Sequence, residues 1–186
     1  MTTPTTVIPA YVAGTWAIDT LNSTVGFAVS YLGVAKVRGR FNDVTGEIVT
    51  ADEPERSVVS ARIAAASIDT GFPARDAYIQ SADVLAAEEY TDIIFASTGV
   101  RAVGEKYLLD GALTIRGRTR PITLTASLGG IADDPTEGRR VLGVSAVTGI
   151  KRCDYGLSTT IPSPVIGANV RVELDIHATL VCDGED

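Results

Sequence analysis

Apolar and polar residues alternate along most of this chain, and residues 169–182 show the pattern most fully. Every even position there, from Val170 to Cys182, is apolar or small, whereas five of the six odd positions, from Arg171 to Val181, are polar. A β-strand sends alternate side chains to opposite faces, so this stretch predicts a strand with one apolar face and one polar face.

The same alternation predicts a series of strands separated by short turns, which residues such as Gly117 and Asp133 mark. Only residues 74–90 are dominated by strong helix formers, and they predict an amphipathic helix. A short first strand is expected at 15–19, and the main strands are expected at 24–32, 37–50, 58–69, 93–100, 106–116, 120–128, 140–150 and 169–182.

Alternating strands with short connections predict an antiparallel all-β sheet. A sheet of about eight strands commonly curls and closes, because closure removes unpaired strand edges. We therefore expect an all-β fold, an eight-stranded antiparallel β-barrel with one helix covering an end. Residues 1–14 are expected to form a flexible lead-in, and residues 15–186 a single domain.

The chain of 186 residues carries a formal net charge of −7, which argues against a nucleic-acid partner. No stretch has the character of a signal peptide or a transmembrane helix, so a cytoplasmic location is expected. Cys153 and Cys182 lie far apart and form no CxxC spacing. Reduced structural thiols are therefore favoured over a disulfide framework or a metal site.

The predicted inward positions leave open whether the barrel is filled by its own side chains or holds a ligand. Many of these positions carry small residues, which leave space at normal packing density unless the barrel is flattened. An open apolar cavity suits an apolar ligand, whereas a flattened, self-filled sandwich needs none. The small inward residues are Ala61, Ala65, Gly111, Ala126, Ala146 and Ala178.

Four dispersed segments resemble the YceI-like, polyisoprenoid-binding family, and the resemblance extends from about residue 15 to residue 182. The segments are TWAIDTLNSTVGFAVSYLGVAKVRGRF (15–41), SIDTGFPARDAYIQSADVL (67–85), DGALTIRGRTRPITL (110–124) and IKRCDYGL (150–157). The resemblance implies a lipocalin-like eight-stranded barrel that holds a long isoprenoid chain, in a family generally treated as binding or carrier proteins.

On this basis we expect a non-enzymatic carrier for a polyprenyl or isoprenoid-quinone lipid, held in an apolar tunnel. Transient membrane contact and a homodimer are further expectations, the homodimer from the resemblance. The residues expected to line the tunnel are Val25, Phe27, Val29, Tyr31, Ile63, Phe95, Leu113, Ile115, Leu124, Val144, Ala146, Leu174 and Ile176.

The sequence offers little material for catalysis. The sole histidine, His177, falls on the polar face of its strand beside Asp175, and Cys153 lies in a segment better suited to a bend. We therefore expect no catalytic residue, no metal site and no cofactor. Two alternatives to the carrier remain: a lipid- or quinone-modifying enzyme using the same pocket, with Asp or Tyr as proton donor, and a dry structural or stress-response interaction module.

Charged residues are expected to separate between the two ends of the barrel, because connections alternate between the ends of an up-and-down sheet. The helix-bearing end gathers basic residues, among them Arg116, Arg118 and Arg120, which strand alternation places on the outer face. These charges either solubilise the surface and form ion pairs, or hold a polar head group. The residues expected to meet the head group at this rim are Arg38, Arg75, Arg116 and Arg152.

Overall fold

The computed structural model describes residues 11–157 and 160–181, and most of them form one antiparallel sheet. Short helical segments interrupt it: α1 (Pro73–Gln80) and the 3-10 turns η1 (Pro54–Arg56), η2 (Ala65–Ser67) and η3 (Arg152–Tyr155). The strands are β1 (Gly14–Ile18), β2 (Thr24–Tyr31), β3 (Ala35–Phe41), β4 (Val44–Thr50), β5 (Val58–Ala64), β6 (Ile68–Asp69), β7 (Asp92–Val103), β8 (Lys106–Ile115), β9 (Arg118–Asp133), β10 (Arg140–Lys151) and β11 (Ile166–Leu180).

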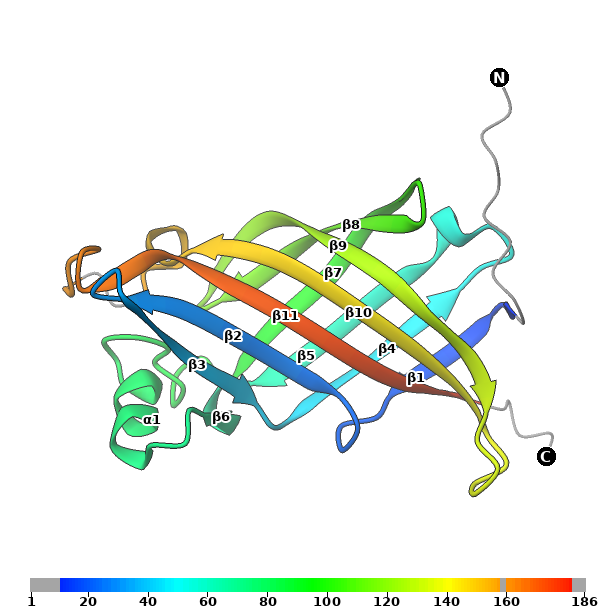
Figure 1. Cartoon of the computed structure of the whole chain (residues 1–186), viewed down its shortest axis with the longest axis horizontal. Coiled ribbons are helices and arrows are strands. Elements are labelled where there is room, and N and C mark those ends of the chain that lie inside the picture. The colour runs from blue at the N-terminus through cyan, green and yellow to red at the C-terminus, as the bar shows by residue number, and fades with distance from the viewer. Residues whose placement is uncertain (1–10, 158–159, 182–186) are drawn as a thin grey trace.

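The sheet closes on itself, which confirms the predicted eight-stranded barrel. Neighbouring strands follow the order β1, β4, β5, β7, β8, β9, β10 and β11, and β11 pairs back to β1 with Trp16 opposite Leu180. The pairs of β11 with β2, β2 with β3 and β3 with β6 extend the wall toward the helix-bearing end (Figure 1). Both β1 and β2 pair with β11, at different parts of its length, so they occupy one strand position of the wall. The pairs β1–β4 and β2–β3, and β4–β5 and β3–β6, continue this division.

Two predicted strands bend sharply instead of running straight. The predicted strand 37–50 divides into β3 and β4, and the predicted strand 58–69 divides into β5 and β6. Hydrogen bonds join the two bends: Asn42 and Asp43 donate their backbone N–H groups to the carbonyl oxygen and Oγ of Ser67, and Ala64 N–H donates to the Asp43 carbonyl. The Ser67 hydroxyl thus accepts a hydrogen bond from the Asp43 N–H group, at the point where the ladder of straight strands is interrupted.

The helix is shorter than the predicted 74–90, because α1 ends at Gln80. The Ser81 hydroxyl donates to the Tyr78 carbonyl at 2.6 Å, and the following residues form turns, with Ala86 at a φ of 49°. These turns bury Val84 and Leu85 against the end of the barrel. Burial of these side chains therefore outweighs the helix propensity of the segment.

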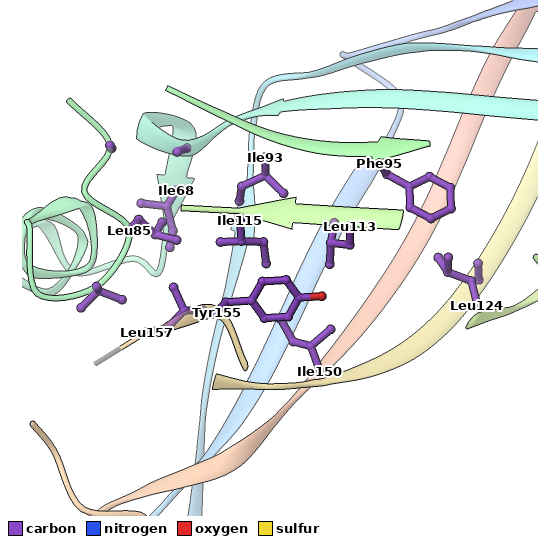
Figure 2. Close-up of a cluster of buried hydrophobic side chains, with 14 of the residues drawn as sticks. Ile68, Leu85, Ile93, Phe95, Leu113, Ile115, Leu124, Ile150, Tyr155 and Leu157 are labelled. Carbon is purple, nitrogen blue, oxygen red and sulfur yellow. The ribbon is translucent and has the colours of Figure 1, made fainter. Parts of the chain in front are cut away.

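Two clusters of buried side chains occupy the barrel. One lies around Trp16 and Leu142, and the Trp16 indole N–H donates to Thr50 Oγ1 at 2.8 Å. Thr50 in turn donates to the Val12 carbonyl, which ties the last part of the predicted lead-in to the barrel; residues 1–10 lie outside the described part. The larger cluster extends from Leu85 and Leu157 at the helix-bearing end to Phe95 and Leu124 inside the barrel (Figure 2). Within the described residues, no helix is long and apolar enough to cross a membrane.

Candidate functional site

A cavity of about 210 Å³ lies within the barrel, and Leu124, Ala146 and Leu174 are among the residues that line it. We call it the inner cavity. Inward-facing side chains from β1, β2, β4, β5 and β7–β11 form most of its wall, so the alternation along each strand produces it directly. None of its described lining residues is charged. Its few polar lining residues are Tyr11, Thr50, Ser57, Tyr107 and Thr148.

An outer cavity of about 590 Å³ lies at the helix-bearing end, bordered by residues of β2, β3 and α1. It shares the lining residues Val25, Ile63, Leu113 and Val172 with the inner cavity, so the two abut. Unlike the inner cavity, it has charged side chains in its wall, Arg75 and Arg152. The interior is therefore a long apolar space with a polar end, rather than a self-filled sandwich.

All the side chains expected to line a tunnel border one of these two cavities. Whether a ligand contacts them stays a prediction. Val25, Phe27, Val29, Tyr31, Ile63, Leu113 and Ile115 border the outer cavity, and Val25, Ile63, Phe95, Leu113, Leu124, Val144, Ala146, Leu174 and Ile176 border the inner one. Strand alternation does not predict Phe72 and Tyr78 in the outer wall or Tyr11 in the inner wall, because their positions depend on how segments outside the strands pack against the barrel.

The four predicted rim arginines lie in different settings. Arg75 borders the outer cavity, and its Nε donates to Thr70 Oγ1 at 2.8 Å while its Nη2 donates to the Thr70 carbonyl at 2.9 Å. Arg38 is exposed on β3 and borders neither cavity. Arg152 is buried in the wall of the outer cavity.

Arg116 does not point outward, and the prediction from strand alternation is wrong for it. Its backbone has a φ of 50°, so the chain leaves the strand geometry there. The guanidinium donates to the carbonyl oxygens of Ala82 at 2.6 Å and Gly156 at 2.8 Å. Arg116 thereby joins the turns after α1 to η3. Arg118 and Arg120, by contrast, are exposed.

Tyr155 is the most deeply buried polar side chain near the outer cavity. Figure 2 shows its ring among Leu113, Ile115 and Ile150, and only 1% of the residue is exposed. Its hydroxyl has no hydrogen-bond partner within the described structure. Burial raises the pKa of this hydroxyl above its usual value, so the hydroxyl stays neutral.

Replacing Tyr155 with Phe should therefore stabilise the protein, because it removes a buried hydroxyl that forms no hydrogen bond. We expect the free energy of unfolding to rise by about 1 kcal/mol, measured by thermal unfolding followed by circular dichroism. Tyr11→Phe is the matched control with the opposite sign, since the Tyr11 hydroxyl donates to the Ala51 carbonyl at 2.6 Å. A loss of stability in Tyr155→Phe would show that the hydroxyl has a partner.

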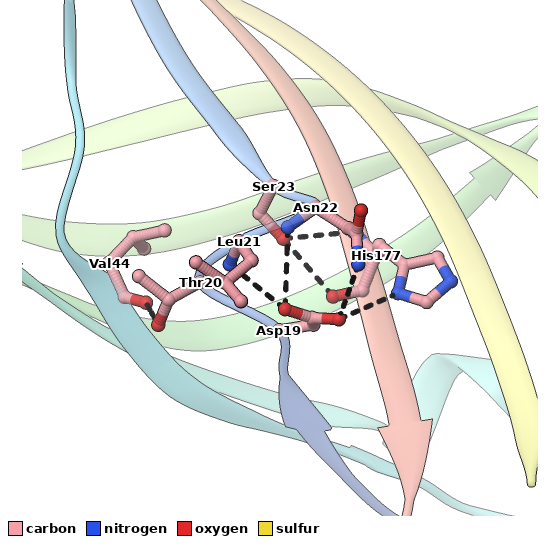
Figure 3. Close-up of polar contacts among 7 residues, drawn as sticks. All are labelled: Asp19, Thr20, Leu21, Asn22, Ser23, Val44 and His177. Atoms are coloured by element: carbon pink, nitrogen blue, oxygen red, sulfur yellow. Dashed lines mark hydrogen bonds and ion pairs between the residues drawn. The ribbon is translucent and has the colours of Figure 1, made fainter. Parts of the chain in front are cut away.

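A second polar cluster lies on the outside of the barrel, at the turn between β1 and β2 (Figure 3). Asp19 accepts hydrogen bonds from the Asn22 side chain and from the backbone N–H groups of Leu21 and Asn22, and these bonds lower its pKa. His177 Nδ1 lies 3.6 Å from Asp19 Oδ2. Ser23 Oγ bonds the backbone of His177 and not its ring, so the three side chains do not form a proton relay.

Cys153 is a free thiol, as expected, but it is exposed rather than packed in the core, and Cys182 lies outside the described residues. The described part of the chain contains no group of three His, Cys, Asp or Glu side chains placed to hold a metal ion. What the structure does bring together is an apolar interior whose polar groups lie near its ends.

A sequence profile of the YceI-like domain matches residues 16–178. This chain belongs to the YceI-like family. A UPF0312 protein of Photorhabdus laumondii is similar to this YceI-like chain, with 38% identity over 133 residues that cover 70% of this chain and 68% of the relative.

Solved structures share the YceI-like barrel. BcnA of Burkholderia cenocepacia superposes with a TM-score of 0.79 at 19% identity, covering 87% of this chain and 99% of BcnA. A polyisoprenoid binding domain from Saccharophagus degradans, implicated in plant cell wall breakdown, superposes with a TM-score of 0.68 at 19% identity, covering 89% of this chain and 98% of that domain. At these identities the likeness shows the fold alone.

Proposed function

We propose that this YceI-like protein is a non-enzymatic carrier that binds a long-chain isoprenoid lipid, of the polyprenyl or isoprenoid-quinone type, inside its barrel. The observation that carries the proposal is the pair of abutting cavities, which share lining residues such as Leu113 and have charged lining residues only in the outer one. A binding domain for polyisoprenoids among the structures with the same fold supports the ligand class.

The ligand direction follows from the placement of the polar groups. The inner cavity has no charged residue among the described residues that line it, and it suits a hydrocarbon tail. In the wall of the outer cavity, the Arg75 guanidinium lies 5.9 Å from the centre of the ring of Phe72, a residue that is 57% exposed. A polar or phosphate head group would therefore meet Arg75 while the tail extends inward.

Burial energies indicate how long the tail must be. Each buried methylene contributes about 0.8 kcal/mol, so a five-carbon isoprene unit contributes about 4 kcal/mol at most. Association itself costs about 4–15 kcal/mol. Several buried units are therefore needed before binding is tight, which favours long-chain ligands over single terpenes.

Affinity for isoprenoid quinones should accordingly rise with the number of isoprene units and then level off once the cavities are full. Quinones with one common ring and tails of increasing length, presented in detergent micelles, test this by displacement of a fluorescent lipid. Native mass spectrometry of the gently purified protein, with solvent extraction, identifies any lipid already bound. Equal affinity for all tail lengths, or chemical conversion of the quinone ring, would contradict a carrier that binds through its tail.

A further inference from the structure

The turn between β2 and β3 exposes two apolar side chains at the helix-bearing end. Leu32 is 52% exposed and Val34 is 88% exposed. Leu32 and Gly33 both have positive φ angles, 52° and 70°. A two-residue hairpin turn of type I′ requires a positive φ at both of its central residues. Asn and Gly suit these angles, whereas Leu is strained there. Neither burial nor turn geometry explains an apolar residue at this tip.

Aromatic side chains at the same end both line the outer cavity and reach solvent. Tyr31, Phe72 and Tyr78 all border that cavity, and each is more than a third exposed, with Phe72 at 57%. Phe72 immediately precedes α1, a position where a capping side chain is usual, and it makes no capping hydrogen bond. We call Tyr31, Phe72 and Tyr78 the mouth. The β2–β3 turn and α1 lie at the same end of the barrel (Figure 1).

Cationic side chains flank this apolar tip. On β3, Lys36, Arg38 and Arg40 occupy alternate exposed positions that face away from the interior. Arg40 lies 3.5 Å from Asp69, whereas Lys36 and Arg38 form no ion pair within the described structure. Their cross-strand partners on β2 are uncharged, because Lys36 lies opposite Ser30 and Arg38 opposite Ala28. Exposed acidic residues at this end lie after α1, at Asp83, Glu88 and Glu89, and in η3, at Asp154.

We propose that residues 32–34, together with the mouth and the cations of β3, form a docking surface that places the outer cavity on an anionic lipid bilayer. This inference rests on the proposed function, since an isoprenoid ligand resides in a bilayer and must enter through an opening. Apolar tips beside basic residues match the interfacial and head-group regions of such a surface. The net charge of −7 opposes long-range attraction, so docking acts at short range, within the Debye length of about 8 Å.

A bilayer fits this surface better than a second protein copy does. Stable protein interfaces bury about 1,200–2,000 Å² with close shape complementarity. Here a few apolar side chains stand on two separate projections around an opening, which offers no continuous complementary face. A fluid lipid surface accommodates such projections and supplies ligand through the opening between them.

Co-sedimentation with vesicles tests the docking surface directly. The variant Leu32→Asn/Val34→Ser removes the apolar tip, and Asn tolerates the positive φ at position 32, so folding is preserved. Leu21→Ser/Val103→Ser is the matched control, because both residues are exposed and border neither cavity. On vesicles of phosphatidylcholine and phosphatidylglycerol, we expect the tip variant to lose at least about tenfold in partitioning and the control to match the parent.

A second variant separates charge from apolar contact. Lys36→Gln/Arg38→Gln should bind mixed vesicles more weakly than the parent at low salt and equally at high salt.

The variant Val34→Trp reports directly on contact between the tip and the bilayer. Its tryptophan emission should shift to shorter wavelength when vesicles bind, while the buried Trp16 contributes a constant signal. Equal partitioning of the parent and the tip variant would overturn the proposal. A dimer that dissociates on Leu32→Asn/Val34→Ser would assign the surface to a second copy and overturn it as well.

Ligand binding from detergent micelles distinguishes failure of the docking surface from failure of the carrier function. Micelles deliver quinone without a bilayer, so the tip variant should bind it as the parent does. If the parent binds no isoprenoid from micelles, the proposed function fails whatever the vesicle result. If the parent binds from micelles and does not partition onto anionic vesicles, only the docking surface fails.

Discussion

Replacing Ala146 with Phe should abolish tight binding of an isoprenoid ligand while the barrel still folds. Ala146 lies on β10 opposite Ala126 and Leu174, and its methyl group faces the inner cavity. The new ring occupies the space of at least one isoprene unit. At about 0.8 kcal/mol per methylene, that exclusion weakens binding by about a hundredfold or more. Displacement of a fluorescent lipid from the variant in micelles measures the loss.

Val147→Phe is the matched control, because Val147 follows Ala146 on β10 and faces outward, 39% exposed. It should bind ligand as the parent does. The free energy of unfolding of Ala146→Phe should change by less than about 1.5 kcal/mol, since the ring enters open space rather than a filled core. If Ala146→Phe unfolds readily and its folded fraction still binds lipid, the interior is already packed and the carrier proposal fails.

Alternation was sufficient to predict the walls of the barrel. The apolar residues of β10 and β11, such as Leu142 and Leu174, face one closed interior, and a register slip of one residue would turn the whole set toward water. Because each long strand has one buried face and one wetted face, its inward residues could be named from the sequence. The predicted tunnel residues border the cavities for this reason.

The bends, turns and ends of the barrel could not be predicted in the same way. The corner at Ser67 depends on hydrogen bonds to Asn42 and Asp43, which are remote in sequence. Alternation also fails at Arg116, because its positive φ takes the backbone out of the strand conformation and its guanidinium bonds Ala82 and Gly156. Phe72 enters the cavity wall only through the docking of α1 on the barrel. Such contacts are long-range and carry no periodic signal.

Replacing Arg152 with Met should cause the largest loss of stability among the predicted rim residues. Arg152 is 8% exposed, and its guanidinium donates to the carbonyl oxygens of Leu157 at 3.2 Å, Ile166 at 2.7 Å and Gly167 at 2.8 Å. It thereby ties the start of η3 to the start of β11. Hydrogen bonds from a charged donor contribute about 1.5–3 kcal/mol each, and Met leaves these oxygens without that donor. We expect the free energy of unfolding to fall by at least about 3 kcal/mol, which lowers Tm by roughly 6–12 °C for a chain of this size.

Lys151→Met is the control for Arg152→Met, since Lys151 is the exposed neighbour and its side chain should contribute little to stability. Arg152→Lys should recover only part of the loss, because one ammonium cannot reproduce the planar fork that reaches three carbonyl groups. Thermal unfolding without ligand reports the structural role, and quinone affinity from micelles reports any contact with a head group. A stable Arg152→Met variant with weakened quinone binding would assign Arg152 to the ligand instead. If Arg152→Met instead loses stability in the absence of ligand, the role of Arg152 is to hold this end of the barrel together. Arg75 is then the cation of the outer cavity wall that can meet a head group.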